Sequence, residues 1–268
     1  MDEVKKFAVF GNPVNHSLSP FIHKEFAKQH KINIQYKQIE PESDDFETHA
    51  QSFFSKKGLG ANVTIPFKDQ AFMFADQADD ISKQCECANT LWHDGGMIKA
   101  FNTDGLGFIS DLNNKEIILT DMSVLIIGAG GSARSIANSF ANKEISSLTV
   151  MSRTQENIDR LSNQCSGMFD IKKYSEGQNF DLVINTTPVS MMNREISFPK
   201  DIINSNTISY DLFYARNSTK FQTWSKDNGA KSYYDGIGML IEQAALSYKI
   251  WNDFTPDTKS MEKMIRSI

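Results

Sequence analysis

The sequence predicts an α/β protein with two α/β domains that flank a cleft. Short apolar runs alternate with longer amphipathic segments in two separate series, and a glycine cluster directly follows one apolar run. Such alternation indicates parallel strands joined by crossover helices, because a parallel neighbour cannot be reached by a tight turn. A chain of 268 residues with 40% hydrophobic residues can also bury two cores.

The first series occupies the first hundred residues. Its expected strands and helices alternate as strand 7–10, helix 20–30, strand 35–39, helix 44–56 and strand 59–63. Two further strands, 87–93 and 97–102, are separated by Asp94-Gly95-Gly96, which predicts a hairpin with a glycine turn. We place a domain boundary near Asp104, where Gly105 and Gly107 loosen a helix start.

The second series begins at residue 124. Its expected order is strand 124–127, helix 132–142, strand 148–151, helix 154–164 and strands 182–185 and 207–211. A helical pattern then covers 238–251. Thr255 and Pro256 predict the N-cap and first residue of a last helix.

Composition excludes several classes of function. The chain has 28 Lys and Arg against 33 Asp and Glu, a net charge of −5, so we expect no nucleic-acid or membrane partner. Its 3 cysteines form no C-x-x-C pair and, with the histidines, no ligand set, so we expect no metal and a reducing cytoplasm. No apolar run is long enough for a signal peptide or a membrane span.

The glycine cluster Gly128-Ala129-Gly130-Gly131 lies between a buried strand and a helix, which predicts a dinucleotide-binding loop. Gly128 permits the tight turn, Gly130 lets the backbone approach a pyrophosphate, and the amides from Gly131 through Ser132 to Ala133 point at it. A merely structural turn is the alternative.

The residues after the next strand favour NADP over NAD. No Asp or Glu stands there to bind a ribose 2′-hydroxyl; Arg153 offers a planar cation to a 2′-phosphate, with Ser152 and Thr154 as further donors. The alternative is that Arg153 is a solvated charge at a helix start.

Three polar clusters follow predicted strands of the first half, at residues 11–20, 62–68 and 102–105. Ligands of open α/β sheets bind beyond the carboxyl ends of strands, so these clusters can converge on one crevice. Their side chains suit a small polyhydroxylated acid, whose oxygens we expect to bind Ser17, Ser19, Asn62, Thr64 and Asn89.

At these residues the chain closely resembles the shikimate dehydrogenase family. The motifs that carry the resemblance are G-N-P-x-x-H-S-x-S-P (11–20), G-x-N-V-T-x-P-x-K (60–68), N-T-D-G (102–105), G-A-G-G-x-A (128–133) and D-G-x-G-M-L-x-x-Q (235–243). They span essentially the whole chain in the family's order. The resemblance implies a two-domain enzyme that reversibly reduces 3-dehydroshikimate to shikimate with NADPH, a step toward aromatic amino acids.

The resemblance also implies roles for individual residues. Lys68 and Asp104 become the catalytic pair, and the implied substrate ligands are Ser17, Ser19, Thr64, Asn89, Tyr214 and Gln243. Asp80, Leu212 and Gly236 are placed near the nicotinamide end of the cofactor. We therefore expect a substrate-binding and catalytic domain at 1–104 and 237–268, and a Rossmann-like NADP-binding domain at 105–236.

The chemistry of Lys68 and Asp104 supports the same roles. Hydride delivery to a ketone leaves charge on the oxygen, which the Lys68 ammonium can protonate or polarise, while Asp104 keeps that ammonium charged and oriented. The alternative is a surface ion pair. For Gln243, within an apolar helix, the alternative to a substrate contact is a bond to a neighbouring loop carbonyl.

Some positions depart from the family pattern. The asparagine usual before Arg153 is Ser152, and a second arginine is replaced by Asn157, which predicts a looser clamp on the adenine side. Cys85 and Cys87 replace small residues before Asn89, and we expect them to pack in the interior. Two alternatives stay open: a quinate/shikimate dehydrogenase that uses NAD, and a non-catalytic NADP(H)-binding sensor. The sequence leaves monomer and homodimer equally open.

Overall fold

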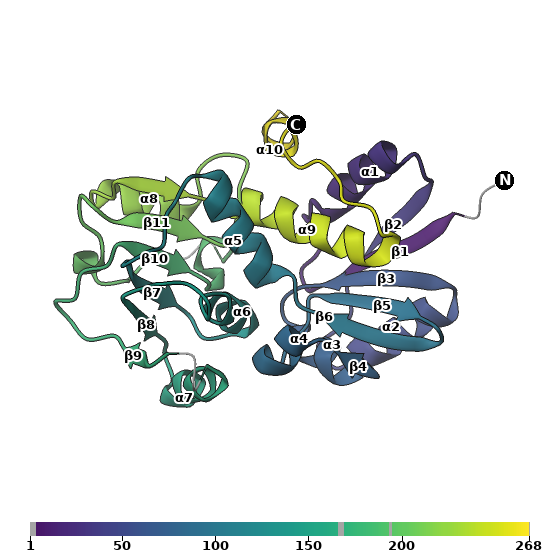
Figure 1. Ribbon diagram of the computed structural model, residues 1–268, viewed down its shortest axis with the longest axis horizontal. Helices are drawn as coiled ribbons and strands as arrows, with labels where there is room; N and C mark the ends of the chain where they lie inside the picture. The colour runs from purple at the N-terminus through teal and green to yellow at the C-terminus, as the bar shows by residue number, and fades with distance from the viewer. Residues whose placement is uncertain (1–3, 166–168, 193–194, 268) are drawn as a thin grey trace. The chain divides into compact units, whose positions relative to one another are not determined.

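The computed structural model describes residues 4–165, 169–192 and 195–267. Within them the chain forms two six-stranded sheets with helices packed on them (Figure 1), which confirms the predicted α/β class. By internal contacts the chain divides into two compact units. Unit 1 comprises the chain up to Gly107 together with the part from Leu240 onward, and unit 2 runs from Phe108 to Met239.

The sheet of unit 1 has the order β2-β1-β3-β5-β6-β4. Its strands are β1 (Lys5–Phe10), β2 (Ile34–Ile39), β3 (Gly58–Val63), β4 (Gln77–Ala78), β5 (Thr90–Asp94) and β6 (Met97–Phe101). β1 is parallel to β2 and β3, whereas β5 is antiparallel to β3 and β6. The predicted hairpin is confirmed: Asp94 pairs with Met97, and Gly95 and Gly96 adopt φ of +60° and +85° in the turn.

The helices of unit 1 pack on both faces of this sheet. They are α1 (Ser19–His30), α2 (Phe46–Ser55), α3 (Lys68–Phe74), α4 (Asp80–Cys85) and α10 (Met261–Arg266), and two more, α5 (Asp104–Asn114) and α9 (Ile237–Asn252), continue from one unit into the other. Phe46 of α2 packs with Phe10 in the core on one face. On the other face the ring of Trp251, from α9, stacks on Phe7 at 4.8 Å. The sequence predicted α1, α2 and α9 but not the short elements α3, α4 and β4.

The last helix begins at Met261, so the prediction that it starts at Thr255 and Pro256 is wrong. The reason is a pair of hydrogen bonds to α1. Gln29 donates to the main-chain oxygen of Asp257 at 3.0 Å and accepts from its main-chain nitrogen at 2.8 Å. Both main-chain groups of Asp257 therefore bond to a side chain, and the segment stays irregular.

The sheet of unit 2 is parallel throughout, with the order β12-β11-β10-β7-β8-β9. Its strands are β7 (Ser123–Ile127), β8 (Ser147–Met151), β9 (Ile171–Lys173), β10 (Leu182–Asn185), β11 (Ile208–Asp211) and β12 (Ser232–Tyr234). Its helices are α6 (Gly131–Ser139), α7 (Gln155–Gln164) and α8 (Lys220–Asp227), with short turns η1 (Pro188–Ser190) and η2 (Lys200–Ile202). Read from β9 to β12, this is the Rossmann strand order 3-2-1-4-5-6, whose direction reverses between β7 and β10.

Three elements of unit 2, β9, α8 and β12, are absent from the sequence prediction, and α6 ends at Ser139 rather than residue 142. α8 is only eight residues long, and it begins with a capping box in which Thr219 and Gln222 bond to each other's main chain.

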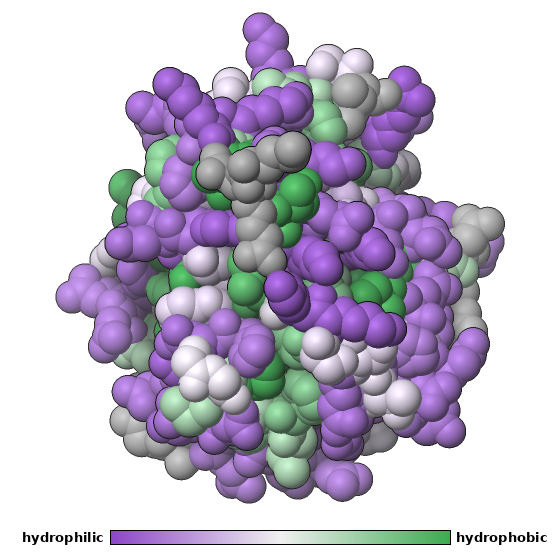
Figure 2. Space-filling model, turned by 90° about the vertical axis from the view of Figure 1, so that its right-hand side faces the viewer, coloured by the Kyte–Doolittle hydropathy of each residue, from purple (hydrophilic) through white to green (hydrophobic). Residues whose placement is uncertain are grey.

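The surface carries no broad apolar area on the face drawn in Figure 2, where hydrophilic side chains separate small hydrophobic groups. The exposed large hydrophobic side chains are Val4, Ile65, Met73, Met97, Leu106, Ile118, Met192 and Met264. Across the part of the chain that the structure describes, every helix is too short or too polar to cross a bilayer.

His23 is a titratable group inside the core of unit 1. Its ring stacks on Tyr36 with centroids 4.6 Å apart and lies 5.2 Å from Trp251. Neither ring nitrogen has a well-formed hydrogen bond to a described residue, and desolvation by burial, opposed only in part by the Asn62 side chain, lowers the pKa of His23 to about 3. His23 is therefore neutral in the folded protein at neutral pH.

We predict that His23 makes stability fall in acid. Below its ordinary pKa of 6.5 the unfolded chain binds a proton that the folded chain does not, so the stability present above pH 6.5 is lost toward pH 3. Between pH 7 and pH 5 this group should lower the free energy of unfolding by about 2 kcal/mol. Urea denaturation of the wild type and of His23→Phe should show that difference, and equal pH dependence in the two proteins would contradict it.

Candidate active site

Lys68 and Asp104 form a nearly buried ion pair in unit 1. Lys68 begins α3 just after β3, and Asp104 begins α5 just after β6. The Lys68 Nζ is bonded to Asp104 Oδ2, and the two side chains are only 14% and 6% exposed. A carboxylate in the first turn of a helix also interacts favourably with the helix dipole. The expected alternative of a surface ion pair is thus contradicted by burial, and each charge needs the other.

Asn89 fixes the second oxygen of this carboxylate. Its Nδ2 donates to Asp104 Oδ1 at 2.8 Å and lies 3.1 Å from Oε1 of Gln243, on α9. Its Oδ1 accepts from the main-chain nitrogen of Thr103 at 2.9 Å. Because a main-chain nitrogen can only donate, this contact sets which end of the Asn89 amide faces Asp104. Lys68, Asp104, Asn89 and Gln243 therefore form one connected group.

Both ends of the Gln243 amide have partners within the protein. Its Oε1 faces Asn89, while its Nε2 donates to the main-chain oxygen of Leu240 at 2.7 Å. The carbonyl partner belongs to its own helix and not to the neighbouring loop of the alternative, and a substrate contact for Gln243 stays a prediction.

Asn62 lies among protein partners. Its Oδ1 accepts from the Tyr36 hydroxyl at 2.7 Å, and its Nδ2 lies within 3.3 Å of the oxygens of Thr90 and Ser247. These bonds give the buried amide the partners that it needs. A substrate contact for Asn62 stays a prediction.

Ser17, Ser19 and Thr64 follow the carboxyl ends of β1 and β3, which are neighbouring strands. Ser17 Oγ accepts from the main-chain nitrogen of Ser19 at 3.3 Å. A Cβ on Gly11 would lie 2.5 Å from Cγ2 of Thr64, so the two loops touch. Gln38 of β2 donates to main-chain oxygens of the first loop, that of Ser17 included. The three hydroxyls are therefore placed at one edge of the sheet.

The glycine loop of unit 2 follows β7, as predicted. Gly128 has φ of +109°, which L side chains rarely adopt, and a Cβ there would lie 2.3 Å from Oγ1 of Thr186. Gly130 differs: a Cβ there would have no atom within 4 Å, and the residue is exposed at the N-terminus of α6. The loop thus leaves open space beside main-chain amides at a helix N-terminus, where an anion binds favourably.

Ser152, Arg153 and Thr154 follow β8, beside this loop. Ile127 pairs with Met151, and the main-chain nitrogen of Gly128 donates to the Met151 oxygen at 2.8 Å. Arg153 and Thr154 are exposed and Ser152 is half-buried. Their side chains can therefore reach a group bound at the glycine loop.

Leu212 and Gly236 also approach each other in unit 2. A Cβ on Gly236 would lie 2.2 Å from the main-chain oxygen of Leu212, so only glycine fits. The preceding carboxylate, Asp211, is buried, and it accepts from Asn185 at 2.9 Å and from Ser190 at 2.6 Å. Burial raises the pKa of Asp211, and these donors oppose that rise. The sequence prediction did not include Asp211, which fixes the start of the segment that carries Leu212 and Tyr214.

The side chain of Asp80 is held by few contacts. It lies in the first turn of α4 with its side chain 95% exposed, and its oxygen is 3.7 Å from Lys83 Nζ. The side chain that caps this helix is Asp79, which accepts from the main-chain nitrogen of Ser82 at 2.8 Å.

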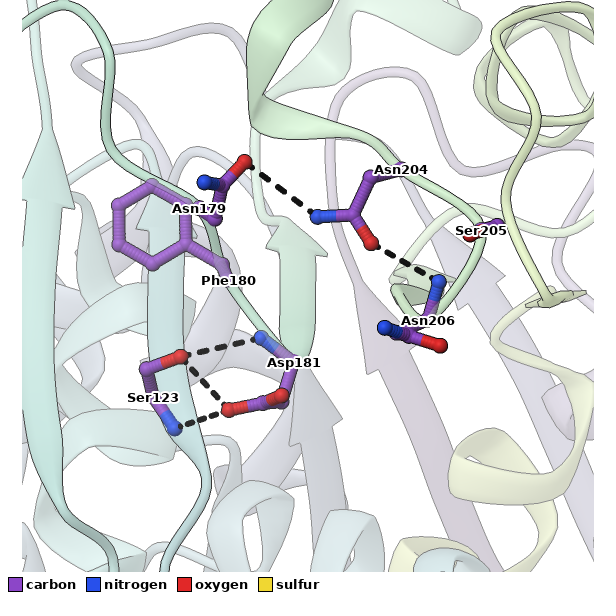
Figure 3. Close-up of a pocket in the computed structure, with 7 residues that line it drawn as sticks. All are labelled: Ser123, Asn179, Phe180, Asp181, Asn204, Ser205 and Asn206. Carbon is purple, nitrogen blue, oxygen red and sulfur yellow. Dashed lines mark hydrogen bonds between the residues drawn. The ribbon is translucent and has the colours of Figure 1, made fainter.

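A polar pocket of about 430 Å³ lies at the opposite edge of the unit 2 sheet (Figure 3). It is lined by Ser123 at the start of β7, by Asp181 just before β10, and by Asn179, Phe180, Asn204, Ser205 and Asn206. Ser123 and Asp181 bond to each other there. Ligands of such sheets bind beyond the carboxyl ends of strands, so this pocket does not correspond to the glycine loop.

Two features of the described residues bear on redox and metal chemistry. Cys85 and Cys87 are buried, and Cys87 Sγ accepts from Asn102 at 3.2 Å. Among the same residues, no three His, Cys, Asp or Glu side chains are grouped as metal ligands.

Three family models match the chain. They are the shikimate dehydrogenase substrate binding domain at residues 9–91, the shikimate/quinate 5-dehydrogenase model at 111–206, and the shikimate 5′-dehydrogenase C-terminal domain at 236–266. A relative from Vibrio atlanticus (strain LGP32), named shikimate dehydrogenase (NADP(+)), is 37% identical over 98% of this chain and 97% of its own.

Solved structures agree with these matches. Shikimate dehydrogenase from Aquifex aeolicus superposes with a TM-score of 0.88 at 26% identity, covering 99% of each chain. The enzyme from Thermus thermophilus, solved in complex with NADP(H) and shikimate, gives 0.86 at 26% identity, covering 98% of this chain and 99% of that one.

The two glycines of the loop should respond oppositely to substitution. Gly128→Ala forces a side chain into a positive φ and against Thr186, so it should lower the free energy of unfolding by at least about 2 kcal/mol. Gly130→Ala meets no atom and should change it by less than about 0.5 kcal/mol. Urea denaturation measures both, and equal losses would show that the space around Gly128 is not what excludes a side chain.

Proposed function

Because the chain belongs to the shikimate dehydrogenase family, we propose that it catalyses the reversible, NADPH-dependent reduction of 3-dehydroshikimate to shikimate. The 37% identity over nearly the full length of both chains supports this assignment. In this proposal residues 1–104 and 237–268 bind substrate, and residues 105–236 bind NADP. The enzyme is an oxidoreductase of the shikimate pathway and works in the cytoplasm.

The observation that carries the proposal is the buried pair of Lys68 and Asp104. When bound, the reduced nicotinamide supplies a hydride to the carbonyl carbon. The Lys68 ammonium donates to the carbonyl oxygen as charge develops there, and so stabilises the transition state. Asp104 orients that ammonium, and Asn89 fixes Asp104 in turn. In the reverse direction the same pair accepts the proton of the shikimate hydroxyl.

Polar groups around this pair are the proposed substrate ligands. Asn89 and Gln243 are bonded to each other next to Asp104, and the hydroxyls of Ser17, Ser19 and Thr64 lie at the carboxyl ends of the neighbouring strands. We assign them to the hydroxyls and the carboxylate of substrate. Asn62 and Tyr214 complete the proposed set.

The residues of the glycine loop fit a dinucleotide. Gly130 leaves space for the pyrophosphate, and the amides of Gly131, Ser132 and Ala133 donate to it, with Gly128 and Ala129 forming the turn. Arg153 binds the 2′-phosphate with Ser152 and Thr154 beside it. Asp80, Leu212 and Gly236 are the proposed contacts at the nicotinamide end.

A spectrophotometric assay tests the function directly. The wild type should form NADPH from NADP⁺ when shikimate is added, and Lys68→Ala should lower kcat at least about a thousandfold because the oxygen loses its donor. NADPH binding to that variant, measured by fluorescence titration, should stay near that of the wild type. Near-normal turnover by Lys68→Ala would refute its role, and an inactive wild type would refute the function.

A quinate/shikimate dehydrogenase that uses NAD is the alternative, since one matching family model carries both acids in its description. Measuring both acids with both cofactors separates the two. We expect preference for shikimate with NADP⁺, and Arg153→Ala should raise the KM for NADP⁺ about tenfold or more while the KM for NAD⁺ changes little. A wild type that prefers NAD⁺ would contradict the assignment of Arg153.

A further inference from the structure

Two buried hydroxyls, those of Thr90 and Ser247, connect the site to the interior of unit 1. Thr90 is the first residue of β5 and Ser247 lies one turn after Gln243 on α9; both are fully buried. Their oxygens are 2.7 Å apart. Thr90 Oγ1 also lies 2.9 Å from Oδ1 of Asn89, and Ser247 Oγ lies 3.0 Å from Nδ2 of Asn62. No sequence motif indicated either residue.

The chemistry of the two amides fixes the direction of two of these hydrogen bonds. The amide nitrogen of Asn62 can only donate, so Ser247 Oγ accepts from it. Thr90 has one hydrogen, which it donates to Asn89 Oδ1. Ser247 has one hydrogen and two acceptors within reach, Thr90 Oγ1 at 2.7 Å and the main-chain oxygen of Gln243 at 3.0 Å. That main-chain oxygen also lies 3.1 Å from the Thr103 hydroxyl.

The result is a connected series of hydrogen bonds between buried side chains. It runs from Tyr36 to Asn62, then through Ser247, Thr90 and Asn89, and it ends at Asp104 Oδ1. Hydrogen bonds in a connected buried network polarise one another. Here the last acceptor is the carboxylate that holds Lys68.

We propose that Thr90 and Ser247 are positioning residues, which fix the Asn89 amide and through it orient Asp104 and Lys68. An asparagine amide can rotate to exchange its nitrogen and oxygen, and the wrong orientation would place an oxygen against the Asp104 carboxylate. The Thr90 hydroxyl adds to the Thr103 main-chain nitrogen in opposing that rotation, because both donate to the Asn89 oxygen in the observed orientation. This inference rests on the proposed function, since it concerns the orientation of the proposed substrate ligands.

The test compares hydroxyl removal with hydroxyl retention in the shikimate assay. Thr90→Val keeps the shape and removes the hydroxyl, and it should lower kcat/KM for shikimate about tenfold, because the buried Asn89 oxygen loses one of its donors. Thr90→Ser keeps the hydroxyl and should stay within about threefold of the wild type. The KM for NADP⁺ should stay within about twofold in both variants, since the hydrogen-bonded residues of this series all belong to unit 1.

Ser247→Ala supplies a second variant that adds no volume. It should lower kcat/KM for shikimate about fivefold, and combining it with Thr90→Val should add little, because the two hydroxyls act in one series. Ser225→Ala is the matched control: Ser225 is also a fully buried helix serine, but its hydroxyl has no partner among the described residues. That control should keep the wild-type constants.

Rates are compared per folded enzyme, with folding checked by circular dichroism. If Thr90→Val and Ser247→Ala both stay within threefold of the wild type, or if Thr90→Ser is as impaired as Thr90→Val, the proposal is overturned. A lower melting temperature with kcat/KM for shikimate unchanged per folded enzyme would show a merely structural role and would also overturn it. A wild type inactive on shikimate would refute the proposed function instead.

Discussion

A buried ion pair imposes the main constraint on unit 1. Removing Lys68 and Asp104 from water costs several kcal/mol per charge unless the pair and its neighbours satisfy every polar atom. The structure meets this requirement with Asn89 on one carboxylate oxygen and Lys68 on the other. Three segments far apart in the sequence must therefore meet: the loop after β3, the strand entry at β5 and the start of α5. Their meeting point is where we place the chemistry.

In unit 2 the main constraint is different: the backbone of the glycine loop must be able to approach an anion closely. At Gly128 the positive φ and the nearby Thr186 exclude a side chain, so the turn brings α6 directly after β7. At Gly130 no neighbour excludes one, and the open space remains available to a ligand. The two glycines of one motif therefore differ in what they do. Gly128 is required by the backbone turn, whereas Gly130 leaves space for a ligand. The reversal of strand order between β7 and β10 places this loop at the edge where ligands of such sheets bind.

The sequence allowed the fold class to be predicted, because short apolar runs such as 182–185 alternate with amphipathic segments such as that of α7. It did not reveal α3, α4 or α8, which are too short for a period to emerge. The last helix was misplaced because Gln29, more than two hundred residues away, binds Asp257. At the site, Lys68, Asp104 and Asn89 lie in motifs and were found. Thr90, Ser247 and Asp211 were not, since their partners come from distant segments and no spacing encodes them.

The central claim is that Lys68 and Asp104 meet the reacting oxygen of the substrate. A crystal structure of the protein with shikimate and NADP⁺ tests this most directly. We expect the oxidised hydroxyl within about 3 Å of Lys68 Nζ and of an Asp104 oxygen, with its carbon about 3–3.5 Å from the nicotinamide carbon that accepts the hydride. A shikimate whose reacting hydroxyl faces other side chains, with the ion pair intact and distant from it, would contradict the claim.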